Sequence, residues 1–215
     1  MTNIYQKQVN NWRDDIAKIL YHPSLVKHTG VPKLNDLQMT SLFLPLLLGE
    51  NEKELTSYYA TAIIYIALSR HDDVIERGTL NKSQQLQVLA GDYYSGKYYQ
   101  LLSIEGKTEL IGQLTNSIRL MTEARTQLLC VDKTSEVQRL TASQTIVTAP
   151  TQALFQQLGL TKYVPLAKTI AFCQLPQMDV SDLLGQLEAY EQLPSDLKMY
   201  IRSLLHEQVE LETKL

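Results

Sequence analysis

Apolar residues return every three or four positions along most of the chain, and this spacing predicts α-helices. Sustained alternation of apolar and polar residues, which predicts strands, is nearly absent. Each apolar stripe can bury one face of a helix against a neighbour, so the pattern predicts an all-α fold. The clearest stripes are Val9, Trp12, Ile16, Ile19 and Leu20; Ala60, Ile63, Ile64, Ala67 and Leu68; and Leu110, Leu114, Ile118 and Met121.

Prolines stand mostly between these stripes, where a missing N–H and a fixed φ favour a turn or a helix start. The prolines concerned are Pro23, Pro32, Pro150, Pro165, Pro176 and Pro194, six of the seven in the chain. A last helix is predicted after Pro194, with Ser195 as its N-cap. Its buried stripe is predicted to be Leu197, Tyr200, Ile201, Leu204 and Leu205. No repeat or linker divides the chain, so residues 1–215 are predicted to form one helical bundle domain.

Composition narrows the function classes. The chain is 44% hydrophobic and 20% charged with a net charge of −3, and no basic tract favours nucleic-acid binding. Its longest apolar runs are about seven residues, whereas a membrane-spanning helix needs about 20. The polar N-terminus lacks the pattern of a secretory signal, so we expect a cytoplasmic protein without a transmembrane segment. Cys130 and Cys173 are expected to be reduced core thiols.

The first informative segment ends an apolar helix with the run S-R-H-D-D-V-I-E at residues 69–76. On a continuing helix, Asp72, Asp73 and Glu76 stand three or four positions apart and share one face. Carboxylates in this arrangement suit Mg²⁺ and a bound diphosphate, because Mg²⁺ prefers a few carboxylate oxygens together with waters and phosphates. The alternative is a solvated acidic surface, which is common at helix ends.

The second informative segment begins near Gln84 and contains the run V-L-A-G-D-Y-Y at residues 88–94. Gly91 and Ser95 lie one turn apart, on a line continued by Tyr98 and Leu102, so a neighbouring backbone can approach closely beside aromatic side chains. This pattern favours an interface. The alternative is that the tyrosines of this helix are core or boundary residues of a single bundle. These tyrosines are Tyr93, Tyr94, Tyr98 and Tyr99.

The runs H-D-D-V-I-E and V-L-A-G-D-Y, in this order, resemble the first aspartate-rich motif and the next helix of the trans-isoprenyl diphosphate synthases. The longer run V-L-A-G-D-Y-Y-S-G-K-Y-Y resembles the small component of the heterodimeric heptaprenyl or hexaprenyl diphosphate synthases, which make the side chain of menaquinone. The resemblance implies a truncated isoprenyl synthase fold. It also implies a subunit that supports a large catalytic partner and helps to set product chain length.

Departures from the family pattern bear on catalysis. Glu76 replaces an aspartate of the first motif, a paired arginine is missing, and no Asp-Asp pair follows Asp92. Ionisation of an allylic diphosphate needs Mg²⁺ ions held between two facing carboxylate clusters, and this chain has at most one. We therefore expect no catalytic residue here and Mg²⁺ in the partner. Asp72, Asp73 and Glu76 are then relics or polar groups of an interface.

The resemblance also implies where the partner binds. A growing prenyl chain needs a dry apolar channel, and helices that shape the channel wall can change where elongation stops. The helices bearing Tyr58 to Leu68 and Gly91 to Leu102 are expected to pack against the large subunit. The residues of this predicted subunit interface are Gly91, Asp92, Tyr94, Ser95, Tyr98, Tyr99 and Leu102.

Two other functions stay open at this point. One is a stand-alone short-chain prenyltransferase that uses Asp72, Asp73 and Glu76 together with a second metal cluster. The other is a helical adaptor without a link to isoprenoids, in which both motifs arise by chance.

Overall fold

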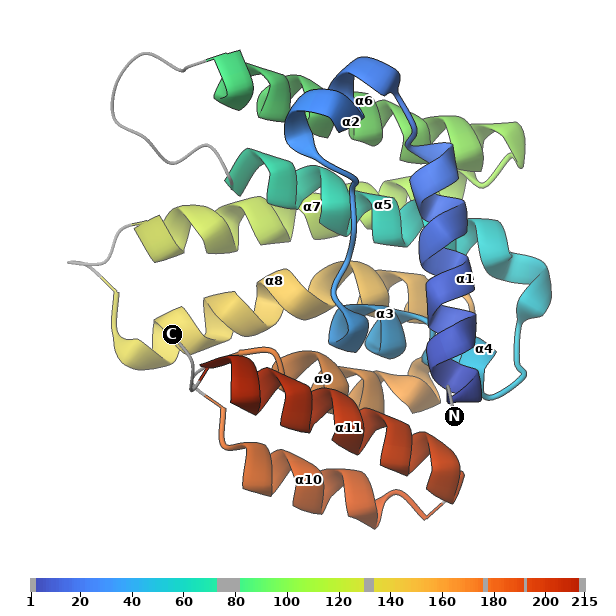
Figure 1. The fold of residues 1–215 in the computed structure, drawn as a ribbon, viewed down its shortest axis with the longest axis vertical. Coiled ribbons are helices and arrows are strands. Elements are labelled where there is room, and N and C mark those ends of the chain that lie inside the picture. Colours follow the sequence, from blue (N-terminus) through green and yellow to red (C-terminus); the bar gives the residue numbers. More distant parts are fainter. Residues whose placement is uncertain (1–2, 73–81, 130–133, 176–177, 192, 213–215) are drawn as a thin grey trace.

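A computed structural model describes residues 3–72, 82–129, 134–175, 178–191 and 193–212. These ranges contain eleven α-helices and no strand, which confirms the predicted all-α bundle (Figure 1). Every helix among them is too short or too polar to span a lipid bilayer. The helices are α1 (Ile4–Ile19), α2 (Pro23–Thr29), α3 (Asp36–Leu42), α4 (Leu44–Leu47), α5 (Leu55–Asp72), α6 (Lys82–Ile104), α7 (Thr108–Leu129), α8 (Glu136–Gln157), α9 (Val164–Phe172), α10 (Val180–Ala189) and α11 (Ser195–Glu212), with short 3₁₀ turns η1 (Glu52–Glu54) and η3 (Thr161–Tyr163).

Helix α5 is the central helix of the bundle. It packs along α6 and also contacts α1, α3 and α8, and Figure 1 shows it crossing the middle of the fold. The predicted stripe from Ala60 to Leu68 is buried except for the half-buried Leu68, but burial extends to Tyr58, Ala62 and Tyr65 on the other faces. A helix with apolar or small residues on every side is covered all round. Its buried Thr61 hydroxyl donates to the Ser57 carbonyl at 2.9 Å.

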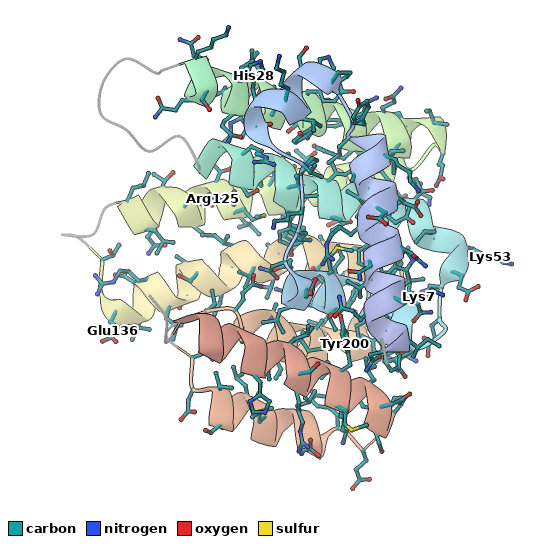
Figure 2. The ribbon with its side chains drawn as sticks, viewed as in Figure 1. Lys7, His28, Lys53, Arg125, Glu136 and Tyr200 are labelled. Atoms are coloured by element: carbon teal, nitrogen blue, oxygen red, sulfur yellow. The ribbon has the colours of Figure 1, made fainter. Side chains whose placement is uncertain are left out.

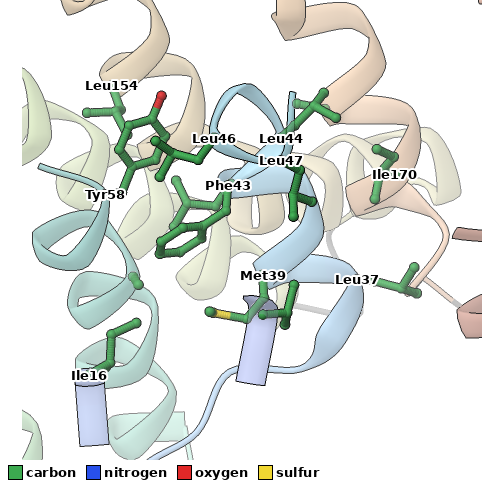
Figure 3. Close-up of a cluster of buried hydrophobic side chains, with 14 of the residues drawn as sticks. Ile16, Leu37, Met39, Phe43, Leu44, Leu46, Leu47, Tyr58, Leu154 and Ile170 are labelled. Carbon is green, nitrogen blue, oxygen red and sulfur yellow. The ribbon is translucent and has the colours of Figure 1, made fainter. Parts of the chain in front are cut away.

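The core is built around Phe43, at the junction of α3 and α4. Its ring stacks on Trp12 of α1 with centroids 4.8 Å apart and lies 5.6 Å from the ring of Tyr58 of α5. Figure 3 shows Leu46 and Leu154 in the same cluster. Burial of one such large apolar side chain contributes about 1.5–3 kcal/mol. The buried cluster extends from α1 to α11, so helices from both ends of the chain share it.

The amphipathic helices follow their predicted stripes. In α11 the five predicted residues are all buried, and Figure 2 shows Tyr200 turned toward the interior while Lys7, Lys53 and Glu136 project from the surface. The helix begins at Ser195 itself, one residue earlier than an N-cap there would require. In α1 and α7 the predicted stripes are buried or half-buried.

Pro150 differs from the sequence expectation, because it lies buried inside α8 and not between helices. A proline inside a helix lacks the N–H that its turn needs. The hydroxyl of Tyr65, from α5, bridges the backbone beside this proline by donating to the Val147 carbonyl at 3.1 Å and accepting from the Thr151 N–H at 3.2 Å. Gln38 of α3 also donates to the Val147 carbonyl, at 2.9 Å. The side chains of two other helices therefore supply hydrogen bonds next to the proline.

This arrangement continues as a network of neutral side chains. Gln174, just after α9, donates to Gln38 Oε1 at 2.7 Å and to the Ala171 carbonyl at 2.9 Å, and accepts from Asn35 at 2.6 Å. Burial raises the pKa of Tyr65, so its hydroxyl keeps its proton. We refer to Gln38, Tyr65, Thr151 and Gln174 as the central polar network. It connects α3, α5, α8 and the end of α9.

Replacement of Tyr65 by Phe tests the central polar network. The change leaves the buried Thr151 N–H without the hydroxyl that accepts its hydrogen bond, and an unsatisfied buried donor costs about 1–3 kcal/mol. We expect the free energy of unfolding, measured by urea titration with circular dichroism, to fall by that amount. Tyr99→Phe is the matched control, because its more exposed hydroxyl is only 3.4 Å from Thr115 Oγ1. Equal stability losses in the two variants would contradict the role of Tyr65.

Candidate functional site

The acidic run begins at the end of α5. Helix α5 ends at Asp72, and Asp73 and Glu76 lie outside the described residues, so their shared carboxylate face stays a prediction. The two residues before Asp72 are held in place by the fold. The Arg70 guanidinium donates to the carbonyls of Thr29 and Val31, at 3.1 and 3.4 Å. His71 Nε2 lies 3.8 Å from Asp92 Oδ1 of α6. The start of the run is thereby tied to α6 and to the connection after α2.

Gly91 lies at a close approach of α6 to α5. A Cβ atom at this position would lie 2.6 Å from His71 Nε2 and 3.0 Å from the Ala67 carbonyl oxygen. The sequence predicts such an approach, and the structure confirms it. The neighbour, however, is α5 of the same chain and not a helix of another subunit.

The predicted interface stripe of α6 divides into two parts. Gly91, Tyr94, Tyr98 and Leu102 are buried within the chain, where they form the contact with the neighbouring helices. Burial raises the pKa of Tyr94 and of Tyr98. This corrects the expectation that the whole stripe faces a partner, because α5 of this chain already covers it. The alternative interpretation, that the tyrosines are core residues, holds for Tyr94 and Tyr98.

The other predicted interface residues remain accessible. Asp92 is 66% exposed, Tyr99 is 42% exposed and Ser95 is half-buried. The Tyr99 ring stacks on Tyr98 with centroids 4.3 Å apart. Side-chain hydrogen bonds, chiefly the one with Thr115 of α7, lower the pKa of Tyr99. An exposed aromatic ring held in one orientation is well suited to contact another protein.

Three further exposed residues join Asp92 and Tyr99 on one line along α6. We define the outer α6 face as the exposed residues Gln85, Leu89, Asp92, Gly96 and Tyr99. Their spacing of three and four positions places them on one side of the helix. Leu89 is 55% exposed, so this face has exposed apolar area at Leu89 as well as at Tyr99. Leu89 is not among the interface residues predicted from the sequence, although it stands at the same helical spacing.

The single aspartates of the C-terminal half serve local helix starts. Asp179 caps α10 by accepting from the Ser181 N–H at 2.8 Å, and Asp182 accepts from Gln186 at 2.9 Å. Asp196 accepts from the N–H of the next residue in the first turn of α11 at 3.0 Å. Asp132 lies outside the described residues. Within the ranges that the structure describes, no group of three or more His, Cys, Asp or Glu side chains is arranged to hold a metal ion.

Comparison with known proteins gives two matches. Residues 22–177 match the family model described as heptaprenyl diphosphate synthase (HEPPP synthase) subunit 1. A segment of 69 residues is 42% identical to heptaprenyl diphosphate synthase component 1 of Geobacillus stearothermophilus. This segment is 32% of the chain and spans 31% of that relative.

Replacement of Gly91 by Ala tests the close contact of α5 and α6. The added methyl group meets a side chain and a backbone oxygen, and overpacking of this kind costs about 1–3 kcal/mol. We expect a lower melting temperature by calorimetry. Gly96→Ala, on the same helix, has no atom within 4 Å of the new methyl group and should gain up to about 1 kcal/mol from helix propensity. If both substitutions stabilise the chain, α5 and α6 are not in the contact described.

Proposed function

The chain belongs to the heptaprenyl diphosphate synthase subunit 1 family, and from this premise we propose that it is the non-catalytic subunit of a heteromeric trans-prenyl diphosphate synthase. Its partner is a larger catalytic polypeptide that holds Mg²⁺ and both aspartate-rich motifs. The product is heptaprenyl or hexaprenyl diphosphate, the precursor of a menaquinone side chain. The fold is a shortened form of the trans-isoprenyl synthase bundle.

The observation that carries the proposal is the neutral centre of the bundle. A synthase must neutralise the negative charge of a departing diphosphate, and it does so with metal ions or cationic groups held on facing walls. The central polar network offers only amides and hydroxyls, and each donor that we describe there has an acceptor within the chain. The described residues of this region do not fit a magnesium and diphosphate site.

The proposed role in setting product length depends on which surface of the chain contacts the catalytic subunit. We assign this contact to the outer α6 face, because Leu89 and Tyr99 expose apolar area there at helical spacing. Helix α6 packs along the largely buried α5, and this packing supports it as a firm surface for a partner. A rigid surface packed against helices of the catalytic subunit fixes the wall of its elongation channel and so the length at which the chain stops growing.

Activity measurements on separate and mixed components test the proposed function. We expect the purified chain to be inactive with isopentenyl diphosphate and an allylic diphosphate, and the mixture with the larger component to form a long-chain product. Turnover by the chain alone would favour the stand-alone prenyltransferase. Failure of the larger component to bind would favour the adaptor.

The acidic run provides a second part of that test. The triple variant Asp72→Asn, Asp73→Asn, Glu76→Gln removes its three carboxylates. Because the catalytic carboxylates are assigned to the partner, the mixture should keep its rate within about threefold, which corresponds to less than about 1 kcal/mol of transition-state stabilisation. A loss of activity with the complex still intact on size exclusion would show that this chain contributes to catalysis.

A double substitution, Leu89→Glu with Tyr99→Glu, tests the outer α6 face. Two buried carboxylates at an apolar contact are costly, so we expect the complex to dissociate on size exclusion chromatography. The isolated chain should keep its melting temperature, because both side chains are exposed in it. Val137→Glu on α8 is the matched control, since Val137 is 74% exposed and lies away from this face. An intact complex with unchanged product length would rule out this contact.

A further inference from the structure

A groove of about 460 Å³ lies along α7 and α8 and reaches α9. Its walls are mostly carboxamide and hydroxyl side chains, such as Gln113 of α7 and Gln152 of α8, and Leu120 and Phe172 add apolar area. The only ionisable side chain among the described residues that line it is Lys168 of α9. The groove therefore carries one positive charge and no carboxylate.

Lys168 differs from Lys107 and Lys162 in having no partner among the described residues. Lys107 Nζ lies 2.8 Å from Glu54 and 2.6 Å from Glu105, and Lys162 Nζ lies 3.0 Å from Glu50. Lys168 is half-buried, and within the described residues it forms neither an ion pair nor a hydrogen bond. A half-buried ammonium group has lost part of its hydration. Its attraction to a carboxylate or another anion brought into the groove is therefore stronger than that of an exposed ammonium group.

The neutral groups of the groove indicate what kind of anion fits. The hydroxyls of Thr141, Thr145 and Thr148 donate to backbone carbonyls four residues earlier. The oxygens of Thr141 and Thr145 keep free acceptor capacity, whereas Thr148 Oγ1 already accepts from Gln152 Nε2 at 2.9 Å. Gln113 and Gln156 are exposed and offer both donors and acceptors. A diphosphate carries several negative charges and needs several cationic or N–H donors. Mixed donors and acceptors with one positive charge are instead complementary to polar side chains of a peptide that includes one carboxylate.

The groove also adjoins the outer α6 face. The hydroxyl of Tyr99 on that face is 3.4 Å from Thr115 of α7, and the next residue, Asn116, lines the groove. A partner that covers Tyr99 therefore needs to extend across only one helix to reach the groove. An open groove beside two packed helices is a common binding site for a helix of another protein.

We infer that the groove receives a helix of the second polypeptide of the synthase, with an Asp or Glu side chain paired to Lys168 Nζ. This inference rests on the proposed function, because it needs the second polypeptide to exist. Lys168 then determines which larger subunit this chain accepts, since a subunit without the carboxylate leaves the ammonium group unpaired.

The test measures the affinity of the purified second component for variants of the full chain by biolayer interferometry at two salt concentrations. Loss of a partly buried ion pair at an interface should weaken binding about 10-fold for Lys168→Gln and further for Lys168→Glu. The salt dependence of binding should also fall for Lys168→Gln. Lys162→Gln is the matched control, because Lys162 is 63% exposed and lies outside the groove. The affinity of this variant for the second component should stay within about twofold of that of the unaltered chain. Replacement of the paired carboxylate by Lys in the second component should restore binding to Lys168→Glu.

The outcomes separate this inference from the proposed function. If the unaltered chain does not bind the second component, the proposed function fails, and the inference fails with it. If the unaltered chain binds and Lys168→Gln and Lys168→Glu bind equally well, the inference is overturned and the proposed function stands. The other candidate occupant of the groove is a small anion, and calorimetry with inorganic pyrophosphate tests for it. Binding of pyrophosphate that Lys168→Gln abolishes, with unchanged affinity for the second component, would make the groove a small-anion site and would also overturn the inference.

Discussion

The arrangement of the bundle depends on hydrogen bonds beside Pro150. A proline inside a buried helix weakens the backbone ladder, and buried N–H and carbonyl groups must find partners elsewhere. Tyr65 and Gln38 provide them from two other helices, and Gln174 holds Gln38 in turn. These bonds have narrow ranges of distance and angle, so they fix the relative positions of α3, α5, α8 and the end of α9. They also fill the centre with neutral groups, which leaves the charged side chains to the surface.

Local patterns and long-range contacts differ in how far the sequence reveals them. The stripes of α1, α7 and α11 were predictable, because a helix with one covered face repeats its apolar residues every three or four positions. The burial of a second face of α5 was not, since residues such as Thr61 and Ser57 are buried there without being apolar. The position of Pro150 inside α8 could not be predicted for another reason. What makes a proline tolerable there is the hydroxyl of Tyr65, which is distant in sequence, so no local pattern indicates it.

The candidate interface illustrates the same limit. A small residue such as Gly91 indicates that another backbone comes close, but contacts within a chain and between chains use the same residue types. The neighbour of Gly91 is α5, which the sequence could not distinguish from a helix of another subunit. The exposed side of α6 was recognisable only in part, through Asp92 and Tyr99. Leu89 could not be recognised from the sequence, because an isolated apolar residue is ordinary on any surface. It becomes informative only because it lies on the same exposed face of α6 as Tyr99.

The distribution of charge connects the fold to the proposed role. The described centre of the bundle is neutral and closed by its own hydrogen bonds, so under the proposed function the chain acts on synthesis through its outer surface. Two features of that surface lie next to each other: the outer α6 face with Tyr99, and the α7–α8 groove with Lys168. One exposes the apolar side chains of Leu89 and Tyr99, which favours stable association. The other has a single unpaired charge, which favours selection among partners. A subunit that stabilises a catalytic partner without replacing it needs both properties, because binding strength alone does not distinguish the correct larger subunit from a related one.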